Sequence, residues 1–162
     1  ATATDISTGK LYIINKGSLV EAVRASISIP IVFSPVKYKK DVLLVDGGLV
    51  NPVPIDIVKK MGANIVIAVH VLHHNFPTDK EEYIELNNLE ENKKVDAGAI
   101  KIGKKSIYIA QDVIAQLQIK LYKPNLVIEP DTRKIKSFDF ARGKDAIKIG
   151  YEETKEVLNN LK

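Results

Sequence analysis

The sequence of 162 residues has no cysteine and no tryptophan, and its only methionine is Met61. Without thiols, disulfide bonds and cysteine-ligated metal sites are excluded. Long apolar runs are missing as well. The longest, such as Ile65–Val69, fall far short of the roughly 20 residues that span a bilayer.

What the sequence does contain is typical of one globular domain. Its 45% hydrophobic and 27% charged residues are enough to form a core under a charged surface. The net charge of +4 is mild, and the basic groups are short: Lys37–Lys40, Lys101–Lys105 and Arg133–Lys136. Only Tyr38 interleaves an aromatic among them, so solvated faces are favoured over an anionic surface partner, and no nucleic-acid partner is expected.

The stretch from Val42 to Pro54 is the most informative one. Four apolar residues predict a short buried strand that ends on Asp46, and Gly47 and Gly48 follow at once. Glycines there permit backbone angles and close approaches that other residues resist. An acid at the carboxyl end of a core strand lies where α/β sheets place ligand crevices. A purely structural Asp-Gly turn is the alternative, because such turns occur in any fold.

Periodicity and turn residues predict an α/β fold with a mostly parallel sheet flanked by helices. Strands are expected at residues 1–5, 11–14, 31–38, 42–45, 64–71 and 126–129, and helices at 18–26, 55–61, 106–122 and 141–161. The sequence strand–helix–strand over residues 42–71 predicts a βαβ unit with parallel pairing.

Apolar stripes on the predicted helices are expected to face the core. In the first helix the stripe is Leu19, Ala22, Val23 and Ser26; in the third it is Ala110, Val113, Ile114, Leu117 and Leu121; in the last it is Ile147, Tyr151, Thr154, Leu158 and Leu161.

Four groups of residues, in this order and spacing, resemble the patatin-like phospholipases, which include the neuropathy target esterases. They are Ala1–Asp5 with Thr8-Gly9, Arg24–Pro30, Asp46-Gly47-Gly48 continuing through Asn51–Pro54, and Val127–Pro130 with Phe138–Phe140. The resemblance runs along the whole chain. It implies a lipid acyl hydrolase with a Ser–Asp dyad, without a cofactor, in which Asp46 is the catalytic acid.

One expected part of such a domain is missing from this sequence. Neither a glycine-rich oxyanion segment nor a Gly-x-Ser-x-Gly nucleophile elbow occurs. The resemblance therefore implies that residues 1–162 are the carboxyl-terminal portion of one patatin-like domain, incomplete at its amino-terminal side. The abrupt start within a predicted strand is consistent with this expectation.

The function that follows is that of one part of an ester hydrolase. Asp46 would serve as the base, while Gly47, Gly48, Ser26 and Pro30 shape the site. Ser26 lies on the apolar side of a predicted helix and Ser28 just before Ile29-Pro30, so neither sits on a nucleophile elbow. The isolated chain is predicted to be inactive. The alternative is a non-catalytic interaction module that keeps the fold without its nucleophile.

The expected partners follow from the same resemblance. The substrate would be an acyl-ester lipid or small ester, reached in the cytoplasm or at a peripheral membrane surface. A sheet without its first strands would expose an edge and an apolar face. We therefore expect self-association or pairing with the missing amino-terminal half.

Histidines and glycines elsewhere suggest weaker alternatives. A metal site could be formed by His70, His73 and His74 with nearby Asp79. Nothing in the sequence forces the loop residues inward, and we therefore predict no metal. One of these histidines remains an outside candidate for a third catalytic member. The run Gly98–Lys104 is close to a phosphate-binding loop, but Lys105 occupies the place of the required Ser or Thr.

Overall fold

The computed structural model describes residues 1–72, 98–135 and 139–161. These residues form two compact units. The first comprises Ala1–Ala68 and Ile100–Val127, and the second comprises the described parts of Val69–Ala99 and Ile128–Lys162.

A four-stranded sheet with the order β2-β1-β4-β3 occupies the first unit. Its strands are β1 (Thr2–Asp5), β2 (Leu11–Ile13), β3 (Val36–Lys39) and β4 (Val42–Asp46). All three pairings are antiparallel, and Ala3 lies opposite Asp46 in the β1–β4 register. The expected strands at residues 1–5, 11–14 and 42–45 are thus confirmed.

The expected strand at residues 31–38 begins later than predicted. Its first residues form a turn, in which the amides of Val32 and Phe33 both donate to the carbonyl of Ile29. Ile31, directly after Pro30, has a φ of 71°. A β-branched residue in this left-handed region is strained, and it cannot continue a strand.

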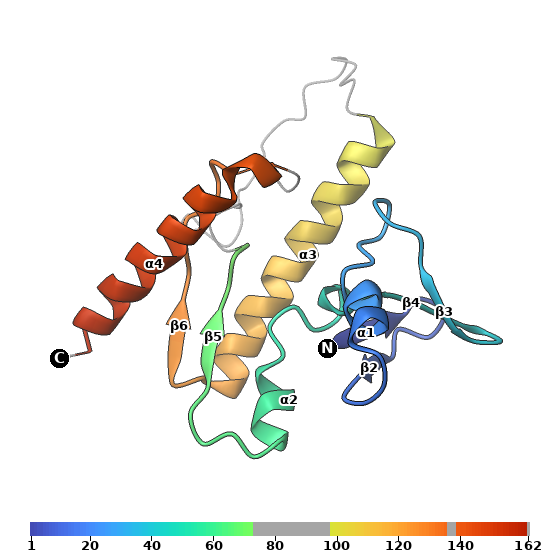
Figure 1. Cartoon of the computed structure of the whole chain (residues 1–162), viewed down its shortest axis with the longest axis horizontal. Helices are drawn as coiled ribbons and strands as arrows, with labels where there is room; N and C mark the ends of the chain where they lie inside the picture. The colour runs from blue at the N-terminus through green and yellow to red at the C-terminus, as the bar shows by residue number, and fades with distance from the viewer. Residues whose placement is uncertain (73–97, 136–138, 162) are drawn as a thin grey trace, which may run out of the picture. The chain divides into compact units, whose positions relative to one another are not determined.

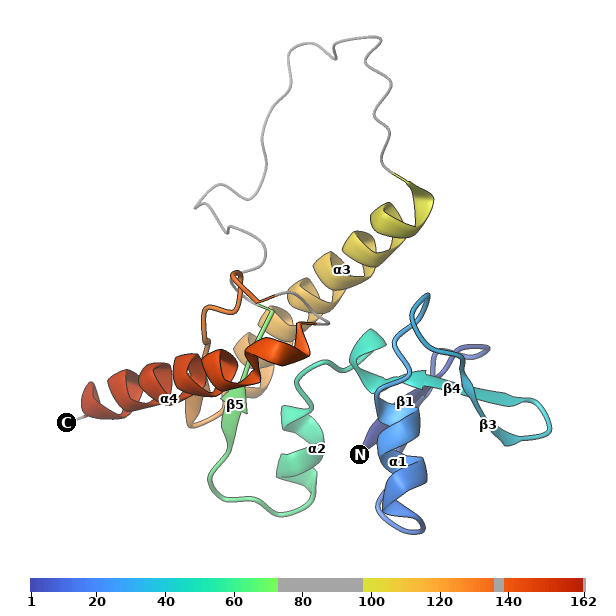
Figure 2. The same ribbon diagram turned by 45° about the horizontal axis from the view of Figure 1, so that its top comes forward.

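Helix α1 (Leu19–Ser26) lies against strands β1 and β4 (Figures 1 and 2). Ser18 caps it: its hydroxyl accepts a hydrogen bond from the amide of Glu21 at 3.4 Å. The core between helix and sheet consists of Ala3, Ala25 and Leu44. The buried face of α1 is narrower than predicted, since Ala22 and Ala25 are buried but Leu19 and Val23 are exposed.

The predicted βαβ unit over residues 42–71 is wrong. After β4 the chain forms a 3-10 turn, η1 (Gly47–Leu49), then α2 (Ile55–Lys60), then β5 (Ile67–Val69). Strand β5 pairs with β6 (Leu126–Ile128), not with β4. Both edges of β4 are already bonded to β1 and β3, so no edge is left for a third strand. The larger sheet is therefore antiparallel, in contrast to the mostly parallel sheet that we expected.

The β5–β6 pair itself is parallel. The carbonyl of Val66 accepts hydrogen bonds from the amides of Asn125 and Leu126, and farther along the amide of His70 donates to Ile128. Residue numbers rise in the same direction on both strands, as parallel pairing requires. The fold is thus of mixed α and β type, and parallel pairing is confirmed for this pair.

Helix α3 (Ala99–Tyr122) is longer than the predicted helix and turns a different side inward. Ala115 packs in a core with Val53 and Ile55, and Gln111 and Asp112 are buried with it. The predicted core stripe is open instead: Val113 is 50% exposed, Leu117 59% and Leu121 70%. Within the described residues, the prediction that this stripe faces the core is therefore wrong, and only Ile114 of the stripe is partly buried.

The second unit contains a 3-10 turn, η3 (Phe140–Arg142), and α4 (Gly143–Asn159), as expected for residues 141–161. None of the residues of α4 is buried, and Ile147, Tyr151 and Leu158 of its predicted core stripe are exposed. Among the described helices, none has the length and apolar character needed to cross a membrane.

Candidate active site

Asp46 is the last residue of β4, and three neighbouring segments hold it. Its amide donates to the carbonyl of Ser28 at 2.9 Å, and β1 pairs along its other edge. Its side-chain Oδ1 accepts a hydrogen bond from the amide of Gly48 at 2.7 Å. Asp46 therefore caps η1 and has one oriented carboxylate oxygen. The other oxygen, Oδ2, makes no hydrogen bond within the part of the chain that the structure describes.

The carboxyl of Asp46 is half-buried. Burial raises its pKa above the ordinary value because desolvation disfavours the charged form, and the hydrogen bond from Gly48 acts in the opposite direction. A raised pKa is what a carboxylate needs in order to accept a proton near neutral pH.

Gly47 is required by a close approach of the η1 turn to strand β1. A Cβ added at Gly47 would lie 2.4 Å from Thr2 Oγ1 and 2.7 Å from the carbonyl carbon of Thr2. Because backbone atoms of β1 occupy that space, no side chain fits at this position. Gly47 thus allows the chain to turn tightly against β1 directly after the acid.

Gly48 lies between the carboxylate of Asp46 and α3. A Cβ at Gly48 would lie 3.1 Å from Asp46 Oδ1 and 3.1 Å from Gln111 Nε2. The amide side chain of Gln111 is therefore close to the acid. Sequence reasoning did not select Gln111. In the sequence, Gln111 is only a polar residue beside an apolar stripe, and a polar residue in such a position is usually solvated.

The block Arg24–Pro30 contacts Asp46 through its backbone, because the carbonyl of Ser28 accepts a hydrogen bond from the amide of Asp46. Ser28 is fully buried; its hydroxyl donates to the carbonyl of Arg24 at 2.7 Å and accepts from the Arg24 guanidinium. A second guanidinium nitrogen donates to the carbonyl of Ser34 at 3.0 Å. With its hydroxyl so engaged, Ser28 positions the edge of β4 through its backbone. Arg24 opens the block that the sequence selected, but its bonds to Ser28 and Ser34 were not predicted.

Ser26 and Pro30 frame this block. Ser26 is the last residue of α1 and Pro30 precedes the strained Ile31, and both are partly buried. Neither residue hydrogen-bonds to the carboxylate of Asp46 within the described residues, so their supporting role stays a prediction.

A second polar network follows the acid. The side chain of Asn51 accepts a hydrogen bond from Gln118 and donates one to Asp56, both at 2.9 Å. Asn51 is buried, and Asp56 is in the first turn of α2. This chain of bonds fixes the segment Asn51–Pro54 between α2 and α3, which stiffens the exit from the Asp46 turn.

His70 belongs to the other compact unit. It is buried at the end of β5, and its Nδ1 lies 3.7 Å from Glu129 Oε1. His73, His74 and Asp79 lie outside the described residues. Within the described ranges, no three His, Asp or Glu side chains are grouped to hold a metal ion.

The run Gly98–Lys104 does not form a phosphate-binding loop. Helix α3 begins at Ala99, so Gly103 and Lys104 are helical residues. In a phosphate-binding loop the glycines form a non-helical turn whose amides point at the ligand. Gly103 and Lys104 lie instead inside the helix, where an amide donates to the carbonyl four residues before it.

Comparison with known proteins gives an independent indication. Residues 2–59, which include the Asp46 turn and the block Arg24–Pro30, match the family model described as patatin-like phospholipase. Patatin-like phospholipase domain-containing protein 7 from Mus musculus is 42% identical over 72 residues, which cover 44% of this chain and 5% of that protein. Patatin-like phospholipase domain-containing protein 6 from Mus musculus is 30% identical over 168 residues, which cover 96% of this chain and 12% of that protein.

Bacterial relatives are found as well. An uncharacterized NTE family protein of Mycobacterium tuberculosis is 41% identical over 69 residues, which cover 43% of this chain and 19% of that protein. The chain therefore spans a small part of the length of each of these relatives. The resemblance predicted from the sequence is confirmed.

Proposed function

We propose, from the premise that residues 2–59 belong to the patatin-like phospholipase family, that this chain is part of a lipid acyl hydrolase and supplies its catalytic acid, Asp46. One observation supports the proposal above others. Asp46 ends a core strand with one oxygen held by Gly48 and the pKa of its carboxyl raised by burial. The expected substrate class is an acyl-ester lipid.

In the proposed reaction, Asp46 Oδ2 accepts the proton of a serine hydroxyl while the serine oxygen attacks the ester carbonyl carbon. The carbonyl π bond opens to an oxyanion. The oxyanion then collapses and the ester C–O bond breaks, and Asp46 returns the proton to the leaving alcohol. A water molecule next attacks the acyl-serine and gives its proton to Asp46. Release of the fatty acid returns that proton to serine.

The hydrogen bond from Gly48 would orient the carboxylate throughout this cycle. It holds Oδ1, so that Oδ2 points consistently to the same side of the strand end. Close packing of Gly47 on Thr2 limits movement of the turn. Positioning of this kind is a large part of general-base catalysis, because the base must lie within hydrogen-bond reach of the proton.

The nucleophile has to come from another polypeptide segment, since no serine of this chain lies in a Gly-x-Ser-x-Gly elbow. The open apolar stripe of α3 (Val113, Leu117 and Leu121) supports docking of such a segment. We expect the isolated chain to self-associate through such faces. Light scattering that shows a monodisperse monomer would contradict this expectation.

The test uses a polypeptide that contains both this chain and a Gly-x-Ser-x-Gly segment. A fluorogenic acyl ester should be hydrolysed, and a fluorophosphonate probe should label the elbow serine. Asp46→Asn should lower the rate by about 10³-fold or more, because the base is removed while the fold is kept. Retained hydrolysis in this variant would remove Asp46 from the mechanism.

A non-catalytic interaction module is the second candidate. The exposed stripes of α3 and α4 favour it, since open apolar faces are typical of interaction surfaces. The two candidates differ in one measurement. If the chain, mixed or fused with a Gly-x-Ser-x-Gly segment, binds that segment but leaves the ester and the fluorophosphonate probe unreacted, the interaction module is the correct description.

A further inference from the structure

We infer that one end of the four-stranded sheet docks on an anionic lipid surface. The antiparallel pairing places two turns at this end: the β1–β2 turn (residues 6–10) and the β3–β4 turn (residues 40–41). They are neighbours, because the amide of Ile6 donates to the carbonyl of Leu43 at 3.0 Å. Asp46 lies at the opposite end of β4, about 14 Å away at 3.4 Å per residue.

Cationic side chains are concentrated at these turns. Lys10 ends the first turn, and Lys37, Lys39 and Lys40 come from β3 and the second turn; all four are exposed. Asp41 is the one exposed acid among them, since Asp5 is buried and caps its own turn. The basic end of the sheet (Lys10, Lys37, Lys39 and Lys40) therefore has an excess of positive charge on a small surface.

Exposed apolar and aromatic side chains accompany this charge. Ile6 is 48% exposed and Tyr38 is 55% exposed. Lys39 Nζ lies 5.2 Å from the centre of the Tyr38 ring, and that ring meets the edge of Tyr12 at 5.9 Å between centroids. Tyrosine and lysine together are the side chains that favour the headgroup region of a bilayer. A nucleic acid or an acidic protein would use the lysines but would not require Ile6 at the tip.

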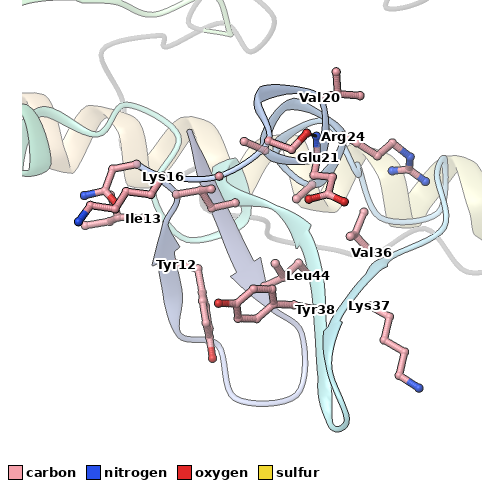
Figure 3. A pocket seen from close by; sticks show the side chains of 16 residues that line it. Tyr12, Ile13, Lys16, Val20, Glu21, Arg24, Val36, Lys37, Tyr38 and Leu44 are labelled. Carbon is pink, nitrogen blue, oxygen red and sulfur yellow. Dashed lines mark hydrogen bonds between the residues drawn. The ribbon is translucent and has the colours of Figure 1, made fainter.

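A groove adjoins the basic end of the sheet. Figure 3 shows Tyr12, Tyr38 and Leu44 on the sheet side, with Glu21 and Arg24 extending from α1. Its volume is about 780 Å³, and its lining includes Tyr12, Lys37 and Tyr38. A membrane docked on the basic end would therefore lie beside this groove. Leu44, at its floor, is two residues from Asp46 on the same strand, and alternation places both side chains on one face of the sheet.

The inference rests on the proposed function only in choosing lipid as the partner. Binding is measured on the 162-residue chain without any hydrolysis, so its failure would leave the role of Asp46 untested but intact. The chain is mixed with phosphatidylcholine vesicles, with or without phosphatidylserine, and the bound fraction is measured by sedimentation. Binding is expected only with phosphatidylserine, and raised salt should weaken it.

The variant Lys37→Gln/Lys39→Gln/Lys40→Gln should bind these vesicles about 100-fold more weakly. A matched control removes three exposed lysines of α4, as Lys144→Gln/Lys148→Gln/Lys155→Gln, with the same change in net charge. The control variant should lose much less of its binding to the phosphatidylserine vesicles. Tyr38→Ala should also weaken binding, and this loss should persist at high salt because it is apolar. Circular dichroism checks that every variant is folded.

Three results would overturn the inference. Equal binding to neutral vesicles would show that charge plays no part, and equal losses in both triple variants would show that the effect is only net charge. Tight binding to single-stranded RNA or to an acidic protein, with no binding to phosphatidylserine vesicles, would assign the basic end of the sheet to a different macromolecule.

Discussion

The turns after β1 and β4 have similar sequences, but their aspartate side chains lie in different environments. Each begins with an aspartate that ends a central strand of one sheet, and each contains glycine. Asp5 accepts hydrogen bonds from the Thr8 hydroxyl at 2.6 Å and the Ser7 amide at 3.1 Å, and the bond from Thr8 holds its pKa below the ordinary value.

Asp46 accepts one amide bond, and burial raises its pKa. The contrast shows that an Asp–Gly turn is structural when its own turn satisfies the carboxylate. The aspartate becomes a candidate base when one carboxylate oxygen makes no hydrogen bond and burial partly desolvates the carboxylate.

The largest expected difference between the two turns is in catalysis. In a polypeptide that also contains a Gly-x-Ser-x-Gly segment, Asp46→Asn should abolish ester hydrolysis, whereas Asp5→Asn should keep most of it. The reason is that only Asp46 has an oxygen available for a proton. Initial rates with a fluorogenic ester measure both, and labelling by a fluorophosphonate checks that the serine is in place. Equal losses in the two variants would mean that both aspartates act through the fold.

The second difference concerns the glycines. Gly47→Ala should destabilise the chain by about 3 kcal/mol, because its Cβ would collide with the backbone of Thr2. Gly9 has a φ of 68° but no atom near a Cβ, so Gly9→Ala should cost only about 1 kcal/mol for the left-handed conformation. Urea denaturation measures both. A smaller loss for Gly47→Ala than for Gly9→Ala would contradict the close approach of the Asp46 turn to β1.

Opposite pH dependence is the third expected difference. The folded pKa of Asp5 is lowered, so its contribution to stability is present above the unfolded pKa of about 3.9 and is lost as the pH falls through the folded pKa. The folded pKa of Asp46 is raised above its unfolded pKa. As the pH rises from the unfolded pKa through the folded pKa, ionisation of Asp46 therefore lowers the free energy of unfolding. At pH 7, Asp5→Asn should therefore lower the free energy of unfolding and Asp46→Asn should raise it slightly.

This sign is tested by repeating the denaturation at several pH values. Both differences from the unsubstituted chain should shrink in acid, where both carboxyls are protonated in the folded and the unfolded state. Shifts of the same sign for the two variants at neutral pH would show that the two turns do not differ in the way described.

Gly48→Ala should give the smallest stability effect, below about 1 kcal/mol, because the flexible amide of Gln111 can yield to a Cβ. The same Cβ would press on Asp46 Oδ1, so hydrolysis should fall more than stability does. Gln111→Ala/Gly48→Ala should recover stability if Gln111 is the group displaced. Denaturation and rate measurements on the single and double variants check this coupling.

Much of the local structure was predictable. Ser18 as a helix cap, Gly62 after α2, and the turns at residues 5–10 and 39–41 follow from side-chain hydrogen bonding and allowed backbone angles, which act over a few residues. Asp46 with Gly47 and Gly48 was selected for the same reason.

Pairing and packing were less predictable. Which strand lies beside β4 depends on residues far away in the sequence, and so the expected βαβ unit was wrong. The stripe of α3 was identified as apolar but wrongly assigned to the core, and neither the burial of Gln111 nor the bonds of the exposed Arg24 gave a signal in the pattern.

By itself, the amino-acid sequence determined where strands and helices form, which acid follows a core strand, and why glycines stand beside that acid. These are consequences of short-range sterics and hydrogen bonding. Only the tertiary structure decided that Asp46 is partly desolvated, since burial depends on which distant segments come together. The bonds that satisfy Asp5 come from Ser7 and Thr8 of its own turn.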